Sequence, residues 1–222
     1  MSFPKDIYMC VKTLDKVEVS VNRWKHLNPE YEIKVYDDEM CETFLLENYG
    51  QTYKDIFQFL SPGPIKADFW RICILYLYGG VYCDVDILPF YQIEAFLEID
   101  VDFVTCSSYD RLVYFNPNFI ISSKGNIILK NAIDWYLNKY DNNVHNGNYW
   151  EYSIMTCFQQ TLKLDNFIKN QDYDGVYNLG DMKVQIINEK YDNFTNDYNE
   201  YKGMKVFNNR CEDWDFSNHC FR

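Results

Sequence analysis

The sequence predicts an α/β fold in which a central mixed sheet is flanked by helices. Short apolar segments with strand-like alternation recur along the chain, between longer segments with apolar residues at helical spacing. With 222 residues and 47% hydrophobic content, the chain can bury one sizeable core. Because no repeat or linker divides it, we expect one domain over residues 1–222, with a polar C-terminal part from about residue 165.

The first half of the chain alternates between strands and helices. Strands are expected at residues 6–12, 31–36 and 81–88, and helices at 15–27, 37–50, 51–60 and 65–78. The helix at 65–78 is apolar almost all round, which is typical of a buried helix. Gly79 and Gly80 end it, because glycine adopts the left-handed turn that closes helices.

The second half carries weaker signals. Strands are expected at residues 102–107, 118–123, 176–179, 183–188 and 205–207, and helices at 126–140 and 149–162. Strands that alternate with helices in this way are typical of a sheet with helices packed against it.

Composition and charge exclude several classes of partner. A net charge of −12 and a pI near 4.6 argue against binding to nucleic acid, which needs a basic surface. The sequence holds no apolar stretch long enough for a membrane span, and residues 1–13 do not resemble a signal peptide.

Residue usage indicates the compartment of the protein and the base composition of its genome. Eight scattered cysteines without zinc spacing predict free thiols in a reducing, cytoplasmic compartment. The 22 asparagines beside 3 alanines indicate an AT-rich genome, as found in some bacteria, protists and large DNA viruses.

Asp68 and Arg71 stand out within the buried helix at 65–78. At a spacing of three residues they lie on one helix face and can form an ion pair. A buried pair contributes little stability, since desolvation offsets much of the attraction. The pair therefore either only sets the local geometry or, as we favour, has a role in the function of the protein.

Asp84 and Asp86 follow the same helix on an expected strand over 81–88. Two carboxylates at this spacing on an extended segment point to one side and repel each other. A hard divalent cation resolves that repulsion, and Mg²⁺ or Mn²⁺ takes one or two carboxylates and leaves positions for phosphates. The alternative is a strand end with two solvated acids.

The stretch ADFWRICILYLYGGVYCDVDILP (67–89) resembles the signature of glycosyltransferase family 32, whose members contain a DxD motif. It is also similar to the corresponding segment of the clostridial toxin glucosyltransferases. The similarity extends over about residues 3–135 and is strongest at 66–89. It implies a GT-A-type (Rossmann-like) nucleotide-sugar-binding domain and transfer of a sugar from a UDP- or GDP-sugar to an acceptor hydroxyl of a glycan or protein, with retention of configuration.

The resemblance also implies residue roles. Asp86 is expected to bind the metal, usually Mn²⁺ with Mg²⁺ as the alternative, and Asp84 to contact the ribose and reach the metal through water. Asp68 and Arg71 are expected to bind the donor sugar. Tyr8 stands where the family has a base-stacking tryptophan and is the expected substitute.

Near the C-terminus, the family's residues that close over the diphosphate have counterparts in a different order. Trp214 and Ser217 are expected at the donor, and His219 is a candidate third metal ligand or a plain surface histidine. His26 and His145 are expected to be exposed.

Two alternative functions stay open from the sequence. The first is a non-catalytic nucleotide-sugar-binding protein on the same fold. The second is a phosphotransferase of the haloacid-dehalogenase type, in which a strand also ends in DxD, although that motif lies near the start of its domain.

Overall fold

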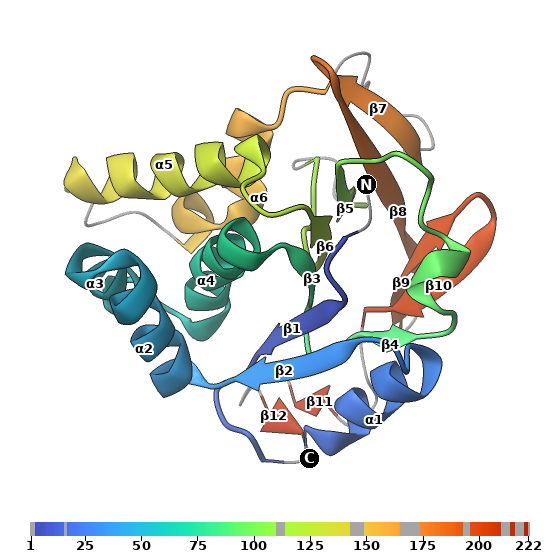
Figure 1. The fold of residues 1–222 in the computed structure, drawn as a ribbon, viewed down its shortest axis with the longest axis horizontal. Helices are drawn as coiled ribbons and strands as arrows, with labels where there is room; N and C mark the ends of the chain where they lie inside the picture. Colours follow the sequence, from blue (N-terminus) through green and yellow to red (C-terminus); the bar gives the residue numbers. More distant parts are fainter. Residues whose placement is uncertain are drawn as a thin grey trace.

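A computed structural model of the chain describes residues 3–15, 17–109, 114–142, 149–164, 174–192, 196–209, 214–215 and 220–221 (Figure 1). The strands are β1 Asp6–Cys10, β2 Glu32–Tyr36, β3 Gly80–Cys83, β4 Leu88–Pro89, β5 Phe103–Cys106, β6 Phe119–Ser122, β7 Gly175–Leu179, β8 Met182–Asp192, β9 Asn196–Tyr201, β10 Met204–Asn208, β11 Trp214–Asp215 and β12 Cys220–Phe221. The helices are α1 Glu18–Leu27, α2 Asp38–Tyr49, α3 Gln51–Phe59, α4 Gly63–Tyr78, α5 Ile127–Asp141 and α6 Ile154–Thr161, with short 3₁₀ turns η1 Ile93–Ala95 and η2 Tyr149–Tyr152.

One mixed sheet runs through the described residues in the order β2-β1-β3-β6-β5-β8-β9-β10-β4, and β7 pairs with β8. Strands β2, β1 and β3 are parallel to one another, and β5 is parallel to β8. Strand β6 runs antiparallel between β3 and β5. The carboxyl ends of β3, β5 and β8 therefore meet at one edge, where ligands of open α/β sheets bind.

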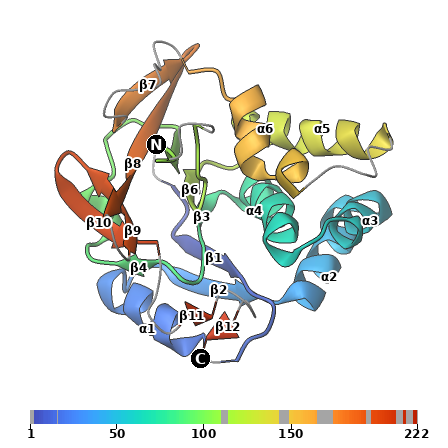
Figure 2. The same cartoon turned by 180° about the vertical axis from the view of Figure 1, so that it is seen from behind.

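The sheet separates two hydrophobic cores. Helices α2 to α6 cover one face, where Phe69 and Trp70 pack with Ile120 and Val184 (Figures 1 and 2). Helix α1 covers the other face through Trp24. The expected α/β fold with helices on both sides of a mixed sheet is confirmed.

The turn from α4 into β3 depends on glycine, as the sequence predicts. Gly79 and Gly80 have φ angles of 71° and 101°, in the region that L side chains rarely adopt. A Cβ atom at Gly79 would lie 2.7 Å from the backbone nitrogen of Lys124, and one at Gly80 would lie 2.8 Å from the carbonyl oxygen of Asp6. Only glycine lets the chain reverse this tightly between the buried helix and the sheet.

The structure differs from the expected elements at several places. The strand expected at 81–88 ends at Cys83, and a turn separates it from β4. The helix expected at 149–162 divides at Ser153, whose side chain accepts a hydrogen bond from Met155 N and caps α6. The sequence did not predict β9, because Asp197 and Asn199 on its buried face remove the hydrophobic alternation.

Candidate functional site

Helix α4 carries Asp68 and Arg71 into the interior next to the carboxyl edge of the sheet. Their relative exposures are 6% and 4%. The Arg71 Nη2 atom lies 3.0 Å from Asp68 Oδ1, the predicted contact across one helical turn. The other carboxylate oxygen of Asp68 accepts a hydrogen bond of 3.0 Å from the backbone N–H of Ile154, at the start of α6.

Arg71 also connects the helix to the DxD motif. Its Nη2 atom lies 3.2 Å from Asp84 Oδ1, and its Nη1 donates a hydrogen bond of 2.7 Å to the carbonyl of Pro117. The guanidinium carbon lies 4.3 Å from the centre of the Tyr82 ring, and the Tyr82 hydroxyl donates to Asp84 Oδ1 at 2.7 Å. The structure thus brings Asp68, Arg71 and Asp84 together around one cation.

Burial and charge act against each other at this cluster. Burial raises the pKa of Asp68 to about 6, although Arg71 and the Ile154 N–H both lower it. Burial alone would lower the pKa of Arg71, but the carboxylates of Asp84 and Asp68 outweigh it and raise the pKa. Arg71 therefore stays charged, and one buried cation holds two carboxylates in place.

The DxD motif lies on a turn at the end of β3, which corrects the expected extended strand. The carbonyl of Asp84 accepts a hydrogen bond from Ile87 N at 3.1 Å, and this closes the turn around Val85 and Asp86. The side chains of Val85 and Ile87 are buried in the core under α1, with exposures of 3% and 0%. The turn thus packs against the core under α1, and Trp24 Nε1 of α1 donates to the Ile87 carbonyl.

The two aspartates fit a hard divalent cation. The Asp84 side chain is 33% exposed, and Asp86 is partly exposed on the same turn, so both are open to solvent at the sheet edge. Within the described residues, no group of three or more His, Cys, Asp and Glu side chains gathers as a metal site. Two carboxylates suffice for Mg²⁺ or Mn²⁺, because water and phosphate oxygens supply the remaining ligands.

The structure describes the side chains of only some of the other predicted site residues. Tyr8 lies on β1, 2% exposed, and pairs with Tyr82 on β3. Trp214 lies in β11, but its side chain is outside the described residues, as are Ser217, His219 and His145. His26 is exposed on α1, as predicted.

The sequence interpretation missed the contribution of Tyr82 and of the backbone at Pro117 and Asn118. The N–H of Asp84 donates to the carbonyl of Asn118 at 2.9 Å, so the start of β6 supports the motif directly. Tyr82 could have been found, since it alternates with Asp84 along the strand and faces the same side. The carbonyl contacts could not, because any residue type can supply them.

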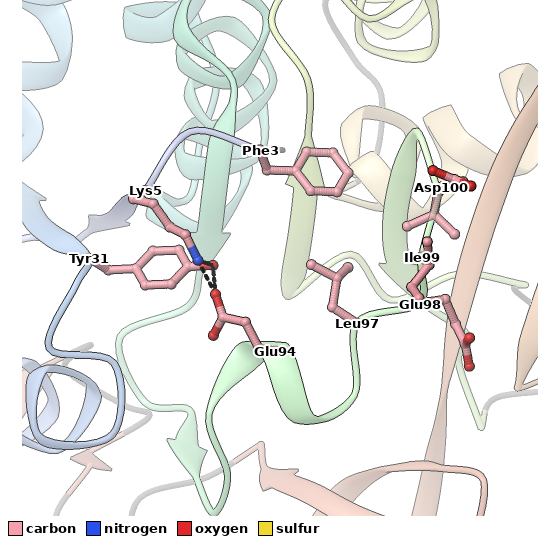
Figure 3. A pocket seen from close by; sticks show the side chains of 9 residues that line it. Phe3, Lys5, Tyr31, Glu94, Leu97, Glu98, Ile99 and Asp100 are labelled. Carbon is pink, nitrogen blue, oxygen red and sulfur yellow. Dashed lines mark hydrogen bonds and ion pairs between the residues drawn. The ribbon is translucent and has the colours of Figure 1, made fainter. Parts of the chain in front are cut away.

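A separate pocket of about 380 Å³ lies at the opposite end of the parallel strands (Figure 3). Lys5 precedes β1 and Tyr31 precedes β2, and both contact Glu94 from η1. Since Asp84 follows the carboxyl end of β3, this pocket is far from the cluster around Arg71. No predicted site residue lines it.

Comparison with known proteins identifies the sequence around the motif. Residues 15–104 match the model described as "Glycosyltransferase sugar-binding region containing DXD motif", and they include Asp68, Arg71, Asp84 and Asp86. Residues 15–104 are therefore similar to the sugar-binding region of DxD-containing glycosyltransferases. The predicted resemblance to DxD-containing sugar transferases is confirmed.

Two curated relatives are mannose-related enzymes. Initiation-specific alpha-1,6-mannosyltransferase of Candida albicans is 29% identical over 76 residues, which is 33% of this chain and 20% of that protein. Mannosyl phosphorylinositol ceramide synthase CSH1 of Saccharomyces cerevisiae is 35% identical over 103 residues, 42% of this chain and 27% of that protein. The chain therefore spans about a quarter or less of the length of these relatives.

A solved structure shares the fold. The "PaToxG Glycosyltransferase" superimposes with a TM-score of 0.53 at 18% identity, over 72% of this chain and 69% of that one. This similarity supports the GT-A-type arrangement predicted from the sequence. Within the described residues, no helix is long and apolar enough to cross a membrane.

Proposed function

We propose that the protein transfers a sugar from a nucleotide-sugar donor to an acceptor hydroxyl, with Mn²⁺ or Mg²⁺ bound at Asp84 and Asp86. The observation that carries the proposal is the contact of Arg71 with both Asp68 and Asp84 at the carboxyl edge of β3. An ion cluster of this kind is costly to bury, so its position beside a family-defining motif argues for use in binding.

Each residue of the cluster has a separate role in this proposal. Arg71 and Tyr82 fix one oxygen of Asp84, which leaves the other oxygen for the ribose or a metal-bound water. Asp86, on the exposed part of the turn, is the direct metal ligand. Asp68 accepts hydrogen bonds from hydroxyl groups of the donor sugar, with its position set by Ile154 N–H and Arg71.

The reaction places new negative charge on the nucleoside diphosphate as the bond to the sugar breaks. The divalent cation, when bound, stabilises that charge as a Lewis acid. The positive field of Arg71 acts in the same direction and costs no reorganisation, because the guanidinium is already fixed by four partners. Retention of configuration is part of the proposal and follows from the family resemblance.

The relatives suggest which donors to test first. Two of them are named for mannose transfer, so a mannosyl donor such as GDP-mannose is the first choice, ahead of UDP-glucose. The acceptor is a hydroxyl of a glycan or protein. The cytoplasmic location stays a prediction.

The decisive test is release of nucleoside diphosphate from a panel of UDP- and GDP-sugars with MnCl₂, measured by chromatography. The Asp86→Ala variant should lose at least 100-fold in kcat/KM while its circular dichroism spectrum stays that of the wild type. The matched control is Asp134→Asn, an exposed acid on α5 paired with Lys130, which should keep full activity. Full activity in Asp86→Ala would refute the metal role.

The same panel separates the alternatives. A nucleotide sugar that raises the melting temperature with Mn²⁺ but is never turned over would favour the non-catalytic binding protein. Hydrolysis of phosphomonoesters without action on nucleotide sugars would favour the phosphotransferase.

A further inference from the structure

Glu189 on β8 is a buried acid outside the predicted site. Its relative exposure is 4%. The β5–β8 ladder pairs Cys106 with Ile187, so Glu189 lies just beyond the carboxyl end of β5, at the edge that carries Asp84. On its other side it pairs with Asn199 of β9.

The Glu189 carboxylate accepts hydrogen bonds from three separate segments. Oε1 accepts from Asn116 Nδ2 at 2.6 Å and from Asn209 Nδ2 at 2.7 Å. Oε2 accepts from the backbone N–H of Tyr109 at 3.1 Å. One carboxylate thus joins both described ends of the connection between β5 and β6 to the residue after β10.

The segment that Glu189 holds is the one that supports the ion cluster. Asn116 is followed by Pro117, whose carbonyl accepts from Arg71 Nη1 at 2.7 Å. Asn118 comes next, and its carbonyl accepts from the backbone N–H of Asp84 at 2.9 Å. A shift of Asn116 therefore moves the partners of both Arg71 and Asp84.

The link through Asn209 leads to the same turn from the other side. Asn208 pairs with Leu88 and Phe207 with Pro89 in the antiparallel ladder of β10 and β4. Continuing this register places Asn209 beside Ile87, directly after Asp86. Glu189 is therefore tied to the chain on both sides of the DxD motif.

We propose that Glu189 is a positioning residue of the sugar-transfer site, which fixes Arg71 and Asp84 through Asn116, Pro117 and Asn118. The role as a part of sugar transfer rests on the proposed function. A carboxylate suits this position because its neighbours are donors, the N–H groups of Asn116, Asn209 and Tyr109 and the Ser108 side chain. A charged acceptor makes stronger hydrogen bonds with such donors than a neutral one.

The ionisation of Glu189 is consistent with this role. Burial raises its pKa to about 7, with a further contribution from Asp197, while the donors Tyr109 N–H and Asn116 lower it. Burial and the nearby charge of Glu189 in turn raise the pKa of the Cys106 thiol on β5. Protonation turns one acceptor oxygen into a donor, so the network is complete only when Glu189 is ionised.

The test compares Glu189→Gln with Glu200→Gln, a more exposed glutamate on β9. Donor turnover by the wild type should rise as the pH increases through about 7. In Glu189→Gln this rise should be absent, and kcat/KM at pH 7.5 should be at least tenfold lower than in the wild type. Glu200→Gln should keep both. If turnover by Glu189→Gln rises with pH in the same way as that of the wild type, the proposal is wrong.

Amide hydrogen exchange tests the same role without a substrate. In Glu189→Gln the Asp84 amide should exchange at least tenfold faster, while the amides of α5 keep wild-type rates. If Glu189→Gln does not fold, Asn116→Ala should give the same local pattern, because it removes the link itself. An unchanged Asp84 amide would refute the positioning role, whereas a wild type that turns over no nucleotide sugar would refute only the proposed function.

Discussion

Replacing Arg71 with methionine removes the one side chain that contacts both Asp68 and Asp84. Methionine keeps much of the apolar stem but leaves Asp68, 6% exposed, with the Ile154 N–H as its remaining described partner. Removing one member of a buried ion pair costs about 3–5 kcal/mol. The Asp84 side chain is 33% exposed and can gain water, so we assign most of this loss to Asp68.

The loss should depend on pH in a defined direction. The pKa of Asp68 is already raised to about 6, and Arg71 is the largest influence that lowers it. Without Arg71 the folded-state pKa rises further above that of the unfolded chain. The folded variant then binds the proton more tightly, so its stability falls as pH rises through that pKa. Each unit of added shift contributes about 1.4 kcal/mol.

The assay is urea unfolding at pH 5.5 and pH 8, followed by the fluorescence of the buried residues Trp24 and Trp70. The variant should lose about 3–5 kcal/mol at pH 8 and at least about 1.4 kcal/mol less at pH 5.5. The control Lys130→Met breaks the exposed pair with Asp134 and should cost less than about 1 kcal/mol at either pH. A loss in the Arg71 variant below about 1 kcal/mol, or one that is equal at both pH values, would refute the reasoning.

Three further outcomes follow from the structure. Gly80→Ala should destabilise the fold by about 2 kcal/mol or more in urea unfolding, because its Cβ would lie 2.8 Å from the Asp6 carbonyl at a φ of 101°. Ser153→Ala should cost about 1 kcal/mol in thermal unfolding, since it removes the cap of α6, and wild-type stability would contradict that role. Burial raises the pKa of Glu189 to about 7, so stability should fall as pH rises from about 4.5 to 7, by roughly 3 kcal/mol. Calorimetry across this range should show a smaller slope in Glu189→Gln than in the wild type, because the part from Asp68, whose pKa is raised to about 6, remains.

The fold class and the centre of the candidate site could be predicted from residue patterns alone. Both depend on patterns between residues that are close together in the sequence. Asp68 and Arg71 are three residues apart on one helix, and their contact follows from helical geometry alone. Gly79 and Gly80 end that helix because the chain can reverse there only with glycine, and the short strand β3 then leads to Asp84 at the carboxyl edge of the sheet.

The contacts between this centre and the rest of the molecule could not be predicted, because they form only when distant segments pack together. The turn after Asp84 packs Val85 and Ile87 against α1, a contact between segments about 60 residues apart. The support from Pro117, Asn118 and Glu189 comes from elements distant in sequence, through carbonyl groups and a carboxylate on β8. Any residue type can supply such a backbone carbonyl, so the sequence does not indicate these contacts. A buried acid in a strand only interrupts the hydrophobic alternation from which a strand is predicted. Only the pairing of β8 with β5 and β9 places this acid next to Asn116 and Asn209.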